Sequence, residues 1–158
     1  MRTHLAPFLA TALLVAIGCG RLPYRSFRVP GEGMEPTIAK GQTVFVRWYG
    51  PGRAPKVQRG GIVVYQSPYD ASVLYISRAV ALGGDTVEIA NGRLRINDQP
   101  VEASYGQCAG APGTAGDFPK RSVPAGSVFL LGDNWNRSFD SRMFGPLRTG
   151  LIVGTRLE

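Results

Sequence analysis

The sequence has very little histidine or cysteine. The 158-residue chain contains one histidine, His4, which lies in the N-terminal leader. A Ser-His-Asp triad is therefore excluded from the rest of the chain, and so is a zinc site built on histidines. Of the two cysteines, Cys108 has no histidine beside it to activate the thiol. We therefore expect neither a metal ion nor another cofactor.

The chain also lacks an apolar run of about 20 residues, the length that a transmembrane helix needs. Its longest apolar run, from Leu5 to Gly18, spans 14 residues after a short basic start. This pattern is typical of a secretory signal. The Gly-Cys step at Cys19 resembles a bacterial lipobox, in which the cysteine carries lipid. A lipid-modified Cys19, a short membrane anchor and an ordinary cleaved signal are the three alternatives, and each places the body outside the cytoplasm.

The charge is strongly positive, with a formal net charge of +7. Such a charge favours anionic partners, either nucleic acid or anionic lipid. No Lys/Arg run is dense enough for a nucleic-acid patch, and no nucleic-acid-binding signature is present. We therefore expect membrane lipid as a partner and no nucleic acid.

Many glycines (21) and prolines (12) indicate turns and short strands rather than long helices. The clearest local signal is a hairpin in which residues 86–90 and 93–96 alternate apolar and polar side chains around Asn91-Gly92, a pair typical of a type I′ turn. Further strands are expected at 43–49, 61–66, 73–82, 127–133 and 150–158, and a long surface loop at 104–122. These expectations predict a leader at 1–26 and a mainly β body at 27–158, either a small antiparallel barrel or paired sheets.

Three segments of the body stand out: VPGEGMEPTI (29–38), YISRAVALGGDTVEI (75–89) and LLGDNWNRSFDSRMFGPL (130–147). Their order and spacing resemble those of the signal peptidase I (leader peptidase) family. The resemblance implies the family's β fold and a serine/lysine dyad. In that dyad the serine attacks the scissile carbonyl, and a buried, neutral lysine accepts its proton. Backbone amides near the serine stabilise the oxyanion.

Aligning the three segments with the family pattern places other residues at both dyad positions. Met34 matches the methionine that follows the nucleophile, so Gly33 stands at the nucleophile position. Arg78 matches the arginine that follows the catalytic lysine, so Ser77 stands at the base position. Gly31 is common two places before the nucleophile. The third segment keeps the family's scaffold residues: Asp133, Asn134, Ser138, Asp140, Ser141, Arg142 and Gly145.

The resemblance also implies roles for the third segment. Ser138 is expected near the lysine amine of an active relative. Asp140 and Arg142 are expected to form an ion pair that stabilises the scaffold.

These substitutions predict a loss of peptidase chemistry. Glycine cannot attack a carbonyl, and Arg78 keeps its proton at any useful pH. Loss of a serine nucleophile costs a comparable hydrolase on the order of a million-fold in rate. The leading hypothesis is therefore a catalytically inactive signal peptidase I-like protein, tethered to a bacterial membrane and facing the periplasm or the exterior. It would bind signal-peptide-like extended peptides or partner a catalytic paralogue. The alternatives are an active peptidase with a displaced dyad and a structural envelope lipoprotein.

Overall fold

The computed structural model describes residues 23–106 and 117–157. His4, Cys19, Cys108 and all but four residues of the expected leader lie outside these ranges. The described elements, in chain order, are β1 (Tyr24–Arg28), β2 (Thr43–Trp48), β3 (Ile62–Gln66), β4 (Leu74–Leu82), β5 (Thr86–Ala90), β6 (Arg93–Ile96), β7 (Gln99–Pro100), η1 (Ser104–Gly106), β8 (Phe118–Ser122), β9 (Ser127–Leu131), α1 (Ser141–Phe144), β10 (Leu147–Arg148), η2 (Thr149–Leu151) and β11 (Ile152–Arg156).

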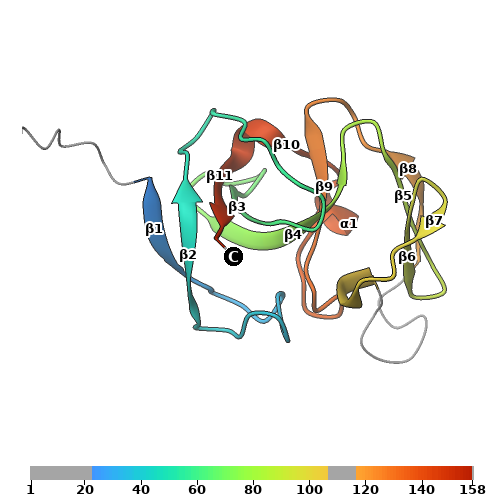
Figure 1. Cartoon of the computed structure of the whole chain (residues 1–158), viewed down its shortest axis with the longest axis horizontal. Helices are drawn as coiled ribbons and strands as arrows, with labels where there is room; N and C mark the ends of the chain where they lie inside the picture. Colours follow the sequence, from blue (N-terminus) through green and yellow to red (C-terminus); the bar gives the residue numbers. More distant parts are fainter. Residues whose placement is uncertain (1–22, 107–116, 158) are drawn as a thin grey trace, which may run out of the picture.

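The strands form two sheets whose described pairings are all antiparallel (Figure 1). The larger sheet has seven strands in the order β1-β2-β11-β3-β4-β9-β10. The smaller sheet has four strands in the order β7-β6-β5-β8. The expected mainly β architecture is confirmed in its paired-sheet form. In the part of the chain described, neither sheet closes on itself into a barrel.

Residue alternation explains how the larger sheet is buried. On β2, Val44 and Val46 are buried, whereas Thr43, Phe45 and Arg47 between them are exposed. The two valines pack with residues 29–38, which cover one face of the sheet. On the opposite face, Val63 and Tyr65 of β3 form a second buried cluster with Leu147 of β10 and Ile152 of β11, and Phe144 of α1 packs against it. The central strands β3 and β9 are therefore buried on both sides, as their continuous apolar runs predict.

The smaller sheet contains the expected hairpin. β5 pairs with β6, with Val87 opposite Ile96 and Ile89 opposite Leu94. Asn91 and Gly92 both have positive φ, 53° and 71°, as a type I′ turn requires. One expectation was wrong, because residues 118–122 of the expected surface loop form strand β8, which pairs with β5. Exposed lysine, arginine and serine occupy most of β8, so its sequence carries no apolar alternation.

The N-terminal edge of the larger sheet is β1, which pairs with β2 along its whole length. β1 begins at Tyr24, whereas the body was expected to begin at Phe27. Within the described ranges, no helix is both long and apolar enough to cross a lipid bilayer.

The turn between β4 and β5 is organised around the buried carboxylate of Asp85. This carboxylate accepts hydrogen bonds from the Leu82 N–H at 2.7 Å and from the Asn97 side chain at 2.9 Å. The Arg59 Nη2 lies 2.8 Å from each of its two oxygens and donates to them. Burial opposes ionisation of Asp85, but these hydrogen bonds and the Arg59 charge outweigh it and lower the pKa of Asp85 below its ordinary value. Asp85 therefore links the two sheets and the segment that precedes β3.

We expect Asp85→Asn to lower the free energy of unfolding at pH 7 by about 1–2 kcal/mol, because several donors lose a charged acceptor. Since the folded-state pKa of Asp85 is lowered, its stabilisation is present above its ordinary pKa and is lost as the pH falls through the folded-state value. Urea unfolding between pH 3 and pH 7 should therefore show a smaller loss of stability at acid pH in the variant. Equal pH dependence in both proteins would contradict this role.

Candidate functional site

A cavity of about 250 Å³ opens between three segments of the chain. Its walls are residues 30–34, which follow β1, residues 75–77 of β4, and residues 137–139, which follow β9. Several residues singled out in the sequence meet there, although they lie far apart along the chain: Gly31, Gly33, Met34, Ser77 and Ser138. The cavity is therefore the candidate functional site.

Gly33 lies directly against Ser138. A Cβ on Gly33 would be 3.5 Å from the Ser138 hydroxyl oxygen and 3.4 Å from its Cα, which is ordinary contact. The carbonyl of Gly33 accepts a hydrogen bond of 3.0 Å from the Asn134 N–H, which fixes this segment to the one after β9. Met34 turns away from solvent into the core and is 1% exposed. Position 33 is thus held firmly and has room for a small side chain.

Gly132 makes the close approach of these segments possible. A Cβ on Gly132 would lie within 3.0 Å of the Ser138 side chain and of the Gly33 carbonyl oxygen. Its N–H donates a hydrogen bond of 3.1 Å to the Asp140 carboxylate. Sequence analysis did not identify Gly132 as a site residue, although it stands inside the third family segment.

Ser77 is buried, with 2% of its surface exposed, and lies on the β4 wall of the cavity. Its hydroxyl and the Tyr65 hydroxyl on β3 form a hydrogen bond of 3.2 Å. Burial raises the pKa of Tyr65 above its ordinary value, so its phenol stays protonated and cannot serve as a base at neutral pH. Nothing in the sequence pointed to Tyr65, because its contact with Ser77 depends on the register of β3 against β4, where Ser77 lies opposite Val63.

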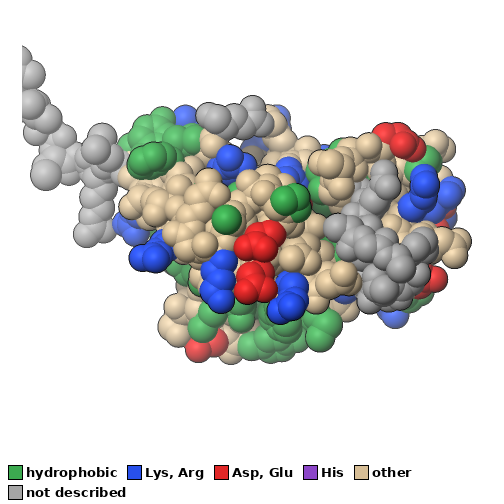
Figure 2. All heavy atoms as spheres, turned by 90° about the horizontal axis from the view of Figure 1, so that it is seen from below, with side chains coloured by type: hydrophobic (Ala, Val, Ile, Leu, Met, Phe, Trp, Pro, Cys, Tyr) green, Lys and Arg blue, Asp and Glu red, His purple; other side chains and the backbone are tan. Residues whose placement is uncertain are grey.

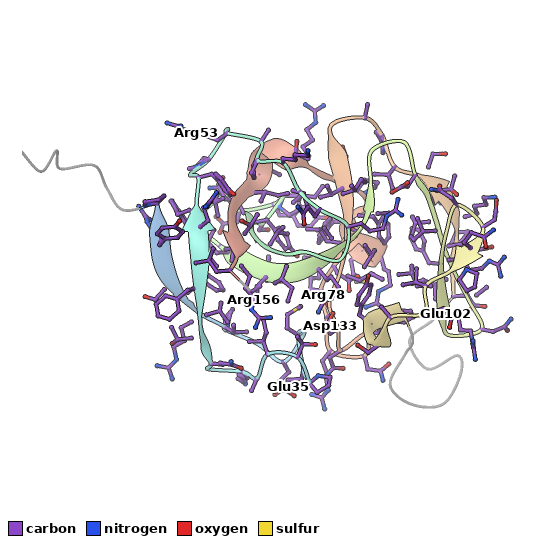
Figure 3. The ribbon with its side chains drawn as sticks, in the orientation of Figure 1. Glu35, Arg53, Arg78, Glu102, Asp133 and Arg156 are labelled. Atoms are coloured by element: carbon purple, nitrogen blue, oxygen red, sulfur yellow. The ribbon has the colours of Figure 1, made fainter. Side chains whose placement is uncertain are left out.

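Beside the cavity, Arg78 and Asp133 form a buried, bidentate ion pair. Arg78 donates hydrogen bonds of 2.8 Å and 2.6 Å to the two carboxylate oxygens, and a third of 2.6 Å to the Gly60 carbonyl. Figure 3 shows the two side chains next to each other, Arg78 from β4 and Asp133 from the segment after β9. The Tyr105 ring lies 4.6 Å from the Arg78 guanidinium. Through these contacts Arg78 connects β4 to the segment after β9 and to the segment before β3, and it does not line the cavity.

The second ion pair, between Asp140 and Arg142, orders the segment that carries Ser138. Arg142 donates 2.9 Å hydrogen bonds to both oxygens of Asp140, which is fully buried. Asp140 also caps the N-terminus of α1 by accepting from the Arg142 N–H. The buried Ser141 hydroxyl accepts a 2.9 Å hydrogen bond from the Leu130 N–H. The geometry is that of the expected scaffold ion pair.

The three lysines of the chain lie outside the cavity lining. The Lys120 amine contacts Asp98 at 2.6 Å on the smaller sheet. Lys56 lines a different cavity, beside Tyr49 and Gln58. Lys40 comes nearest, but its amine lies 3.6 Å from the Glu32 carboxylate and its side chain is 60% exposed. Ser77, which was predicted to stand at the base position, lines the cavity, and none of the three lysines does.

Charged side chains surround the mouth of the cavity. Glu32 contacts Lys40 at 3.6 Å on one side and Arg137 at 3.4 Å on the other. Figure 2 views the molecule from below, where residues 30–40 lie, and shows acidic side chains flanked by basic ones with hydrophobic side chains gathered beneath them. Glu35 lies in the same segment and accepts a 3.3 Å hydrogen bond from the Lys40 N–H, so two acidic and two basic residues lie close together there.

The chain as a whole is similar to a known family of proteins. A family model described as signal peptidase, peptidase S26, matches residues 2–157. The chain belongs to this family. The probable signal peptidase I-1 of Synechocystis sp. is 32% identical over 158 residues, covering 96% of this chain and 78% of the relative. Signal peptidase I V of Bacillus subtilis is 33% identical, covering 93% of each chain.

A solved structure of a family member agrees with the fold. A crystal structure of a signal peptidase I from Enterococcus faecalis V583 is 30% identical to this chain, with a TM-score of 0.55. The match covers 64% of this chain and 97% of that one. The recognition of a signal peptidase I-like chain from its three segments is therefore confirmed.

Proposed function

We propose that this signal peptidase I-like protein is catalytically inactive and binds extended, signal-peptide-like peptides in the cavity. The observation that supports the proposal is the cavity, whose lining brings together Gly33 and Ser77, the residues predicted at the nucleophile and base positions. Gly33 supplies no nucleophile. The Ser77 hydroxyl is hydrogen-bonded to the protonated Tyr65, which is not a base, and arginine cannot replace a neutral lysine as the base.

The edge of β4 at the cavity supports binding by strand addition. β4 pairs with β3 along residues 74–78, but its pairing with β9 begins only at Arg78. Among the described residues, no strand pairs with the other edge of residues 74–77, which form a wall of the cavity. An added peptide strand can use backbone hydrogen bonds there and place alternate side chains in the cavity. Tyr75 and Ile76 on this wall, together with Phe139 from residues 137–139, contribute apolar surface to the cavity.

The proposal also includes where the protein is located in the cell. The leader at 1–26, through a lipid on Cys19 or as an anchor, would tether the body to membrane lipid on the extracytoplasmic side of a bacterial envelope. A bound peptide, or a catalytic paralogue that presents one, would then approach from the membrane surface.

The full chain should bind a synthetic peptide with the sequence of a signal-peptide cleavage region, with a Kd below about 1 mM by calorimetry. Mass spectrometry of the same mixture should show no cleavage. A Cβ on Gly31 would meet nothing within 4 Å, so Gly31→Leu should fill the cavity without disturbing the fold and weaken binding at least about tenfold.

The matched control is Gly150→Leu, since Gly150 also has open space around it and lies away from the cavity. A titration that stays flat up to millimolar peptide would remove the binding proposal. Cleavage of the peptide by the unmodified protein would contradict the proposal that the protein is catalytically inactive.

A further inference from the structure

We infer that the cavity is specific for peptides that end inside it with a free α-carboxylate, rather than for continuous chains that pass through it. This inference rests on the proposed peptide binding and adds the chemical class of the ligand. It comes from the donors and charges that line the cavity and its mouth.

The polar end of the cavity is rich in donors for an anion. The hydroxyls of Ser77 and Ser138 and the guanidinium of Arg137 all lie in its lining. Among residues 23–106 and 117–157, the Ser138 hydroxyl has no hydrogen-bond partner. Because Gly33 has no side chain, a ligand oxygen can occupy the space beside the Ser138 hydroxyl. A carboxylate has two acceptor oxygens and suits this set of donors better than the single carbonyl of an internal peptide bond.

Arg137 is free to change partners. Its side chain is 69% exposed, and its contact with Glu32 is long, at 3.4 Å. Ion pairs of this exposed kind contribute little free energy, so giving one up costs little. Glu32 keeps its second cation, Lys40, at 3.6 Å, and is therefore not left unpaired when Arg137 turns to a ligand.

The lining of the cavity also bears on the last residue of the ligand. Met34, Ile76 and Phe139 form the apolar part of the lining of this cavity of about 250 Å³. The best ligand is therefore an extended peptide whose last residue is apolar, with its carboxylate toward Ser138 and Arg137.

Two peptides of identical sequence test this inference, one ending in alanine as the free acid and one ending in alanine carboxamide. The amide removes the charge and keeps the shape. Calorimetry with the full chain at fixed ionic strength should show the acid binding about tenfold more tightly than the amide, because hydrogen bonds to a charged group are stronger. In Arg137→Gln, this ratio should fall to about one.

Arg148→Gln is the matched control, because Arg148 is an exposed arginine on β10 outside the cavity lining and its loss changes the net charge equally. It should keep the tenfold ratio. Equal binding of acid and amide by the unmodified protein would overturn the carboxylate inference and leave peptide binding standing, whereas binding of neither would overturn both. A ratio that survives in Arg137→Gln, or falls equally in Arg148→Gln, would also overturn it.

Discussion

Replacing Gly132 with alanine is expected to lower the free energy of unfolding by about 3 kcal/mol. The added methyl group would lie within 3.0 Å of the Ser138 side chain and of the Gly33 carbonyl oxygen. Neither neighbour can move easily. The Gly33 carbonyl is held by the Asn134 N–H, and Ser138 precedes the buried Asp140 by two residues. The cost is therefore at the upper end of what overpacking usually produces.

Urea unfolding followed by tryptophan fluorescence measures this loss, and Gly31→Ala provides the matched control. Gly31 lies in the same cavity, but a Cβ there would contact nothing within 4 Å. The control should therefore change stability by less than about 0.5 kcal/mol. Equal stability of the two variants would mean that the segments after β1 and β9 are not packed as closely as described here.

The close approach at Gly132 also determines the shape of the site. Residues 30–34 and 137–139 meet only because Gly132 has no side chain between them. The hydroxyl of Ser138 then faces position 33, and the hydrogen bond from Asn134 fixes the backbone there. We therefore expect Gly132→Ala to weaken peptide binding as well, even though Gly132 does not line the cavity.

Local patterns were sufficient to predict much of the fold. The Asn91-Gly92 hairpin was predicted correctly because turn chemistry and alternation both act over neighbouring residues. β2, β3, β4 and β9 carry enough apolar or β-branched residues to be recognised alone. β8 could not be recognised, since its exposed residues show no period and its pairing with β5 is a contact between distant segments.

The candidate site was likewise predictable only where its residues lie within recognisable motifs. Family spacing identified Gly33, Ser77 and Ser138, and the structure brings all three into one cavity. Tyr65 reaches Ser77 from the neighbouring strand, so its role depends on strand register, which spacing does not give. The Glu32–Arg137 contact joins residues 105 positions apart, and two exposed charged residues carry no sign of such pairing in sequence.

Placing serine at position 33 and lysine at position 77, the predicted dyad positions, by Gly33→Ser with Ser77→Lys is expected to produce peptidase activity at least about a thousandfold above that of the unmodified protein. A serine Cβ at position 33 would make only ordinary contacts, so the hydroxyl can be added without strain. Position 77 is 2% exposed, and burial there should lower the pKa of the introduced lysine toward neutrality, as a general base requires. The Arg78–Asp133 ion pair next to it is already in place to hold β4.

Cleavage of a preprotein peptide, followed by mass spectrometry, measures this gain. Gly33→Ala with Ser77→Lys is the matched control, because it contains the same buried lysine and lacks only the hydroxyl oxygen. It should be as inactive as the unmodified protein, and circular dichroism should show both double variants folded. If the folded serine variant stays inactive, the scaffold has lost more than the two dyad residues. If the unmodified protein already cleaves at the same rate, Gly33 does not stand where the nucleophile would be.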